Sequence, residues 1–238
     1  MTVDVLAVGA HPDDAELGIG GLIHKLTSRG YAVGMLDLTR GEMSTRGSVD
    51  ERAAEALEAA CILGVRMRAN VGLQDGALAN TTEQQRAVIA HFRALRPRIL
   101  IIPMEDDRHP DHRAAHAIAR DANYFSGLAK IETDHEPYRT PHVYLYHPYF
   151  EDRTPPQFVV NVSEHFDPKL AALKAHASQF HNPGYEGQPT YISTERFWNS
   201  IETRAAYWGH RIGVRYGEPL FTNRPIALDV PFGLEEQV

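Results

Sequence analysis

The first half of the chain alternates short apolar runs with segments of helical periodicity. The runs are rich in Val, Leu and Ile, which is typical of strands buried on both faces of a sheet, and they cover residues 3–9, 31–39, 65–73 and 98–103. The segments between and after them predict helices over 14–29, 48–64, 81–97 and 111–126. This alternation predicts an α/β fold with a Rossmann-like, mainly parallel sheet that is flanked by helices.

The second half has a less regular pattern. Strands are expected over 142–150 and 157–163, and helices over 163–180 and 194–210. Links rich in Pro and Gly, which are typical of surface loops, separate these segments. We find no internal repeat, and 238 residues are enough for one sizeable core, so we expect a single domain over 1–238 with a less regular C-terminal part.

Composition narrows the class of protein. Apolar residues make up 43% and charged residues 23%, which is ordinary for a folded, soluble chain. The net charge of −7 has the wrong sign for nucleic-acid binding. Neither an export signal nor a membrane span is evident, so we expect a cytoplasmic protein. The single cysteine, Cys61, falls on an apolar helix face and is expected to be a buried, inert thiol.

Two loops carry the same chemistry. AHPDDAE at 10–16 follows the first predicted strand, and EDDRHPDH at 105–112 follows the fourth. Ligands of open parallel sheets bind outside the carboxyl ends of the strands, so both loops are expected to face one crevice. There, His11, Asp14 and His112 would supply the ligands that a catalytic zinc takes, with one position open to water. The adjacent Asp13 would act as the general base on that water.

Each loop also has a plainer interpretation. Asp13 and Glu16 are compatible with a helix cap, and 106–112 with a solvated acidic turn. Either loop alone would favour that interpretation, because short motifs often occur by chance. The recurrence of His-Pro-Asp after two strands whose ends should converge favours the metal site instead.

Other sites have weaker support. Gly18, Gly20 and Gly21 lie inside the predicted helix, where they cannot cradle a pyrophosphate, and we expect them to allow close helix packing. No G-x-S-x-G nucleophile elbow occurs. Histidines within helical segments are assigned no role, namely His24, His91, His116, His176 and His210.

The two loops resemble the AHPDD-x-E and HPDH motifs of the LmbE-like (PIG-L) superfamily of zinc-dependent deacetylases. Segments 39–48, 178–187 and 197–221 resemble the branch that deacetylates N-acetylglucosaminyl malate in bacillithiol biosynthesis. The resemblance covers essentially the whole chain. It implies hydrolysis of the N-acetyl group of a small N-acetylated glucosaminide with release of acetate. It also implies one Zn2+ per subunit, with another divalent ion such as Fe2+ as the alternative, and a homo-oligomer, often a hexamer.

The resemblance assigns roles to individual residues. It makes His11, Asp14 and His112 the zinc ligands and Asp13 the general base. His109 would stabilise the developing oxyanion or protonate the leaving amine, and Arg52 would bind the substrate.

Softer assignments concern two further loops. Tyr191 is the expected second oxyanion donor, and Tyr185 is its rival. The loop at 39–48 is expected to bind sugar hydroxyls or a carboxylate through Glu42, Ser44 and Arg46. A plain Gly-rich surface loop is the alternative.

Two other functions stay open at this point. One is a bacillithiol-conjugate amidase of the same superfamily. The other is a non-catalytic protein that binds a metal or a sugar. Asp13 and His109 count against the second, because binding alone needs neither a base nor an acid.

Overall fold

A parallel sheet forms the centre of the molecule. The computed structural model describes residues 2–148 and 154–226. In these ranges a five-stranded sheet has the order β3-β2-β1-β4-β5, with every neighbouring pair parallel. The strands are β1 (Val5–Gly9), β2 (Val33–Thr39), β3 (Met67–Leu73), β4 (Ile99–Pro103) and β5 (His142–Tyr146). The four strands expected from the first half are confirmed, and the one expected over 142–150 forms an edge; its residues 149–150 lie outside the described ranges.

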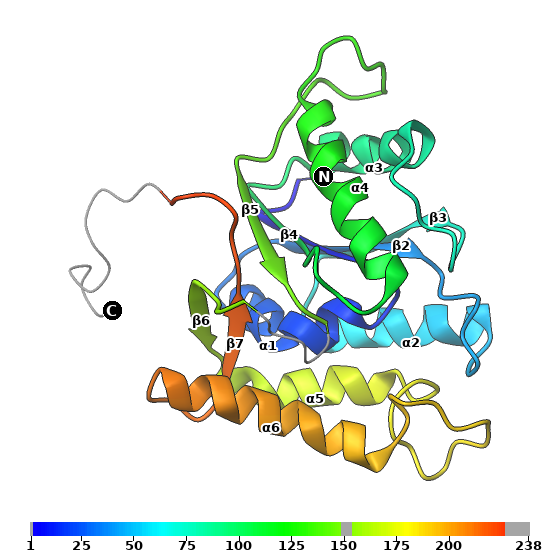
Figure 1. The fold of residues 1–238 in the computed structure, drawn as a ribbon, viewed down its shortest axis with the longest axis vertical. Helices are drawn as coiled ribbons and strands as arrows, with labels where there is room; N and C mark the ends of the chain where they lie inside the picture. Colours follow the sequence, from blue (N-terminus) through cyan, green and yellow to red (C-terminus); the bar gives the residue numbers. More distant parts are fainter. Residues whose placement is uncertain (1, 149–153, 227–238) are drawn as a thin grey trace.

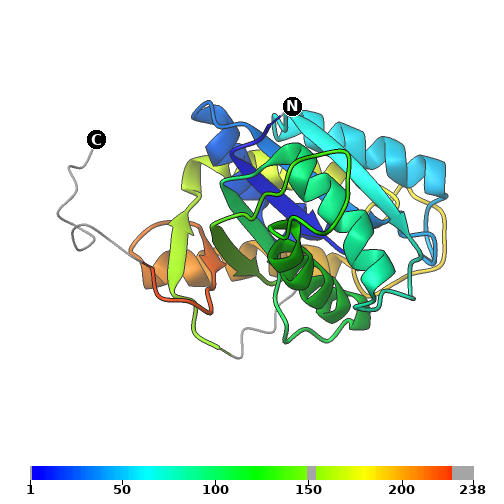
Figure 2. The same ribbon diagram turned by 90° about the horizontal axis from the view of Figure 1, so that it is seen from above.

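Helices cover both faces of this sheet (Figure 1). On one face lie α3 (Thr82–Leu95) and α4 (Pro110–Ser126), and on the other lie α1 (Asp14–Ser28) and α2 (Val49–Ile62). Figure 2 shows the strands running beneath α3 and α4. Because both faces are covered, β1 and β2 are buried at every position, which explains their nearly continuous apolar character. The expected fold class is confirmed.

Local signals define where α2 begins and where α3 ends. The Ser48 side chain accepts a hydrogen bond from the Glu51 backbone N–H, and the Glu51 side chain accepts one from that of Ser48, so a capping box starts α2. At the far end of the next helix, Arg96 adopts a left-handed backbone (φ 46°) directly before Pro97 and ends α3.

The second half adds a layer below α1 and α2. Its elements are β6 (Phe158–Asn161), a 3-10 turn (Ser163–His165), α5 (Phe166–Ala175), α6 (Glu195–Arg211) and β7 (Gly217–Leu220). In Figure 1, α5 lies under α1 and α2, and α6 lies under α5. The helix expected over 163–180 is shorter than predicted, and β7, which pairs antiparallel with β6, was not predicted. None of the described helices combines the length and apolar character needed to cross a membrane.

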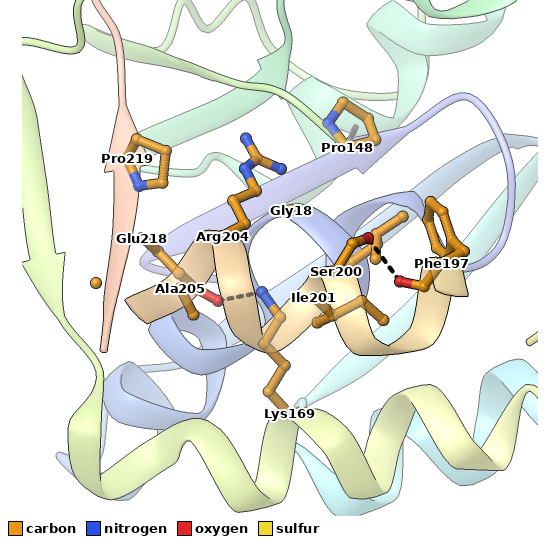
Figure 3. Close-up of a pocket in the computed structure, with 12 residues that line it drawn as sticks. Gly18, Pro148, Lys169, Phe197, Ser200, Ile201, Arg204, Ala205, Glu218 and Pro219 are labelled. Carbon is orange, nitrogen blue, oxygen red and sulfur yellow. Dashed lines mark hydrogen bonds and ion pairs between the residues drawn. The ribbon is translucent and has the colours of Figure 1, made fainter. Parts of the chain in front are cut away.

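A buried ion pair joins this layer to α1 (Figure 3). Lys169 of α5 donates to the Glu218 carboxylate of β7 at 2.6 Å. The same carboxylate accepts from the backbone N–H groups of Gly21 and Leu22, so it caps the second part of α1 beyond an interruption at Ile19 (φ −139°). The neighbouring cavity, of about 20 Å³, has room for a single water molecule and none for a substrate.

Close packing explains a glycine of α1. A Cβ atom at Gly18 would overlap the Tyr146 ring, so the expectation that the α1 glycines permit close approach is confirmed there. The expectation for Cys61 is wrong, because its side chain is exposed. Cys61 follows the fully buried Ala59 by two positions, which places it on the opposite side of α2.

Candidate active site

The two predicted loops meet at the carboxyl ends of β1 and β4, which are neighbours in the sheet. One ligand atom each from His11, Asp14 and His112 lies within 4.8 Å of the others. The His112 Nε2 atom is 3.1 Å from Asp14 Oδ1, and the His11 Nδ1 atom is 3.5 Å from Asp14 Oδ2. Residues almost a hundred positions apart in sequence are thus brought together as expected.

The donor set suits a divalent metal ion. It consists of two imidazoles and one carboxylate, as in many catalytic metal sites. The Nδ1 atom of His112 is 3.1 Å from Asp107 Oδ2, the arrangement that commonly orients a metal-binding imidazole. Burial would lower the pKa of His112, but Asp14 and Asp107 outweigh burial and raise it to about 9. These residues could hold a metal ion that displaces this proton.

Asp13 occupies the N-cap position of α1 without capping it. Its backbone has φ 121°, a strained conformation for a residue other than glycine, and its side chain makes no cap hydrogen bond. The alternative of a simple helix cap is therefore wrong. Burial raises the pKa of Asp13 to about 6, with Arg52 opposing the rise and Asp14 adding to it. A carboxylate with this pKa can accept a proton near neutral pH.

Arg52 ties α2 to both neighbouring loops. Its Nη1 donates to the Gly41 carbonyl at 2.8 Å, and its Nη2 donates to the Pro12 carbonyl at 2.8 Å and to Asp13 Oδ2 at 3.2 Å. Gly41 has a left-handed backbone (φ 67°), and a Cβ atom there would overlap the guanidinium group. The structure thus shows Arg52 holding Asp13 in place at the wall of the candidate site.

His109 caps α4 through its ring. Its Nδ1 accepts a hydrogen bond from the Asp111 N–H at 3.2 Å, so a neutral ring carries its proton on Nε2. The ring centroid lies 4.9 Å from that of His11. The alternative of a solvated acidic turn is wrong, because Asp107, Asp111 and His112 are all buried.

A cavity of about 230 Å³ opens in front of these groups. Its lining consists of His11, Asp13, Met43, Ser44, Arg52, Asp75, Gly76, His109, Gln179 and Ile192. Of the three predicted binding residues of loop 39–48, Ser44 lines it. Glu42 accepts from the Asp75 N–H at 2.8 Å, and Arg46 donates to the Ser178 carbonyl at 2.6 Å, so these two side chains hold neighbouring loops.

The two candidate tyrosines have different surroundings. Tyr191 is 62% exposed beside Ile192, and the Arg108 guanidinium lies 4.8 Å from its ring centroid. Tyr185 is engaged elsewhere, since its hydroxyl donates to Glu51 and accepts from the Gly47 N–H. Of the two, Tyr191 has the hydroxyl without such partners in the described ranges.

Sequence analysis missed two carboxylates around His11. Asp75 Oδ1 lies 3.1 Å and Asp111 Oδ2 lies 3.4 Å from the His11 Nε2 atom. The backbone N–H of Met43 donates to Asp75, and that of Gly76 donates to Asp111. Asp75 follows β3, at the same end of the sheet as the two metal loops. The argument that joined those loops could therefore have found it.

A second group of buried charges lies behind the cavity. Arg68 donates to both Glu16 and Asp37, and the His176 Nε2 atom is 2.9 Å from Glu16 Oε1. Burial would raise the pKa of Glu16, but Arg68 and His176 outweigh burial and lower it to about 2. The four side chains form a buried hydrogen-bonded network, which we call the Arg68 network.

The chain is similar to several known proteins. The diacetylchitobiose deacetylase of Thermococcus kodakarensis is 31% identical over 90% of this chain and 80% of its own length. A probable N-acetyl-alpha-D-glucosaminyl L-malate deacetylase 2 of Bacillus anthracis is 30% identical over 82% of this chain and 93% of that protein. The crystal structure of a conserved protein from Thermus thermophilus superimposes with a TM-score of 0.87, at 38% identity, over 97% of this chain and 99% of that one.

The family pattern begins in β1 and ends within α4. The PIG-L family, described as GlcNAc-PI de-N-acetylase, matches residues 6–123, which include both metal loops. The relatives named above extend the similarity through the second half. The chain therefore belongs to the PIG-L family of deacetylases, as its paired motifs predict, and is a hydrolytic enzyme.

Proposed function

We propose that this enzyme is a zinc-dependent hydrolase that removes the N-acetyl group from an N-acetylglucosamine derivative and releases acetate. One observation carries the proposal: the convergence of His11, Asp14 and His112 within 4.8 Å, with Asp13 directly beside them on the cavity wall. A binding protein has no need of a buried, strained carboxylate at that place.

The side chains of the cavity have different roles in the proposed hydrolysis. A divalent ion held by His11, Asp14 and His112 would lower the pKa of water and polarise the acetyl carbonyl. Asp13 accepts the proton of the attacking water, and Arg52 keeps its carboxylate oriented through the Oδ2 contact.

His109 and Tyr191 complete the proposed reaction. Nε2–H of the neutral His109 ring donates a hydrogen bond to the oxygen that gains negative charge, and the leaving amine takes up the proton that Asp13 accepted from the water. Only a protonated His109 could give its own proton to the amine. Tyr191, which precedes the lining residue Ile192, would supply a second donor to that oxygen. Removing one such donor typically lowers the rate by about 100- to 1,000-fold.

We infer that the substrate is N-acetylglucosaminyl L-malate. The support is the Bacillus anthracis relative, which is similar over most of both chains and carries that substrate in its name. A diacetylchitobiose deacetylase is similar over a comparable length, so the disaccharide is the main competitor. Ser44 and Gln179 on the cavity wall are hydrogen-bonded to each other, and their oxygens keep acceptor capacity for sugar hydroxyls.

The experiment combines metal analysis with an acetate-release assay. The panel is N-acetylglucosaminyl L-malate, N,N'-diacetylchitobiose and an S-conjugate of bacillithiol, with His112→Ala as the inactive control. We expect about one zinc per chain and the highest kcat/KM on the malate derivative. If the protein cleaves only the S-conjugate, its activity is that of a bacillithiol-conjugate amidase and not of a deacetylase. Absence of turnover by the zinc-loaded protein on every compound would contradict an enzyme of this kind.

A further inference from the structure

A second large cavity lies between α4 and the edge strand β5. Its volume is about 330 Å³, and its lining shares no residue with the candidate active site. The polar and charged lining residues are His116, Arg120, Asn123, Tyr124, Arg139, Thr140, Thr222, Asn223 and Arg224. This volume lies within the range of small-molecule pockets, roughly 300–1,000 Å³.

Arginines from three separate segments line this cavity, although the chain carries a net charge of −7. The Arg120 Nε donates to Asp121 at 3.0 Å, and Arg139 donates through Nε and Nη2 to the Tyr124 carbonyl. Arg224 makes no side-chain hydrogen bond within the described ranges. Because each guanidinium has five N–H donors, all three groups keep donors for a ligand.

The floor of the cavity is rigid and polar. The Asn123 amide donates to the Thr140 carbonyl at 3.1 Å, and its oxygen accepts from the Thr140 N–H at 2.9 Å. The Thr140 hydroxyl is buried and finds no hydrogen-bond partner in the described part of the chain. Glu105, a neighbouring carboxylate, is paired with His116 at 3.3 Å and with Asn223. Glu105 thus lies close to two lining residues but does not itself line the cavity.

A second cavity lined by arginines differs from the cavity beside β5, because its lining includes a carboxylate. Arg66, Arg96 and Arg98 line it at the other end of the sheet, but Asp4 lines it too and pairs with Arg98 at 3.8 Å. Among the described residues, no carboxylate lines the cavity beside β5. Asp121, which pairs with Arg120, lies outside the lining, so the positive charge available to an external anion is mainly that of Arg139 and Arg224.

We propose that the cavity beside β5 binds a small phosphate-bearing anion, either inorganic phosphate or a phosphate monoester. Guanidinium groups contributed by three separate segments suit the several oxygens of a tetrahedral anion, whereas one arginine fork can satisfy a flat carboxylate. The hydroxyl and amide groups between them provide uncharged donors, and the volume leaves room for a small organic group on the phosphate.

Calorimetric titration of the metal-loaded protein with inorganic phosphate at constant ionic strength tests this site. We expect the double variant Arg120→Gln, Arg224→Gln to bind phosphate at least tenfold more weakly than the wild type. The control Arg29→Gln, Arg86→Gln removes the same charge from exposed positions after α1 and on α3, and we expect it to bind as the wild type does. All four arginines are exposed, so both variants should fold.

Three outcomes would overturn the proposal. They are no phosphate binding by the wild type, equal weakening in both double variants, and loss of binding in His112→Ala, which would assign the phosphate to the metal site. Titration with glucose 6-phosphate, with glucose as the neutral control, distinguishes a site for phosphate monoesters from a site for inorganic phosphate. Tighter binding than inorganic phosphate identifies a monoester site, and equal binding identifies a site for the free ion.

Discussion

Two clusters of buried charge lie side by side at the start of α1, and they differ in charge balance. In the candidate active site, carboxylates gather around three imidazoles and one guanidinium group; they belong to Asp13, Asp14, Asp75, Asp107 and Asp111. In the Arg68 network, Arg68 pairs with both carboxylates, those of Glu16 and Asp37, and Glu16 also contacts the His176 ring. Asp14 and Glu16 are only two residues apart, yet each belongs to a different cluster.

The difference shows what distinguishes a metal site from a structural network. Buried charges are costly unless they are paired with opposite charges or coordinate a metal. The Arg68 network satisfies this condition by itself. The candidate site has five carboxylates for one guanidinium group, against two for one in the Arg68 network, and a divalent cation would reduce this excess. The excess of negative charge, rather than burial alone, therefore marks the site.

Removing an imidazole from the charge-imbalanced cluster should have the largest effect. We expect His112→Ala to lose its bound metal and to show no acetate release above background, because Asp14 and His11 alone offer too few ligands. Metal analysis and the acetate assay measure both. His91→Ala on α3, away from the site, is the control. A metal-replete and active His112→Ala variant would remove His112 from the ligand set.

Asp13→Asn separates the base from the metal ligands. Asparagine tolerates positive φ, so the loop should keep its shape and the metal should stay bound. We expect kcat to fall by about 100- to 10,000-fold, the usual contribution of a general base. Wild-type turnover by the metal-loaded variant would show that another group accepts the proton.

A substitution in the Arg68 network should affect stability instead. Arg68→Met leaves Glu16 and Asp37 buried without their shared cation, and we expect a loss of about 3–5 kcal/mol in the free energy of unfolding. Urea unfolding measures this, with the exposed Arg29→Met as control. The folded fraction should retain its metal content. If Arg68→Met instead loses its metal at unchanged stability, the Arg68 network is part of the metal site and not a separate structural cluster.

The smallest effect is expected at Arg52, the guanidinium group of the candidate active site. Arg52→Lys keeps the charge but cannot reach Gly41, Pro12 and Asp13 together, because it lacks the planar fork. We expect kcat to fall about tenfold, equivalent to about 1.4 kcal/mol, with little change in KM. A rise in KM at constant kcat would instead assign Arg52 to substrate binding, as the family resemblance implies.

The sequence predicted the parts of the fold whose signals are local. The runs that became β1 and β4 are apolar because they are buried in the middle of the sheet, and Ser48 marks the start of α2 through its capping box. β7 was missed, since the residues GEPL form a strand only through their pairing with β6. Cys61 was misplaced because a two-residue error in helical phase reverses the face.

In the candidate site, too, the sequence predicted the residues that lie in local motifs and missed the one that does not. His11, Asp14 and His112 lie in short motifs, so their meeting could be expected from the positions of the loops. Asp75 stands alone in a turn after β3 and has no pattern of its own. Its contact with His11 depends on how the loops after β1 and β3 fold over the sheet edge. The chemical roles of all these residues remain predictions.

The cap that Glu218 provides to α1 has a consequence for how the chain matures. Its carboxylate and the Gly21 N–H are 197 positions apart, so the helix behind the metal loops leaves the ribosome long before its cap has been synthesised. A nascent chain that stops short of β7 holds both His-Pro-Asp loops but lacks the carboxylate that accepts from the Gly21 and Leu22 N–H groups. These two groups meet their acceptor only after β7 has been synthesised.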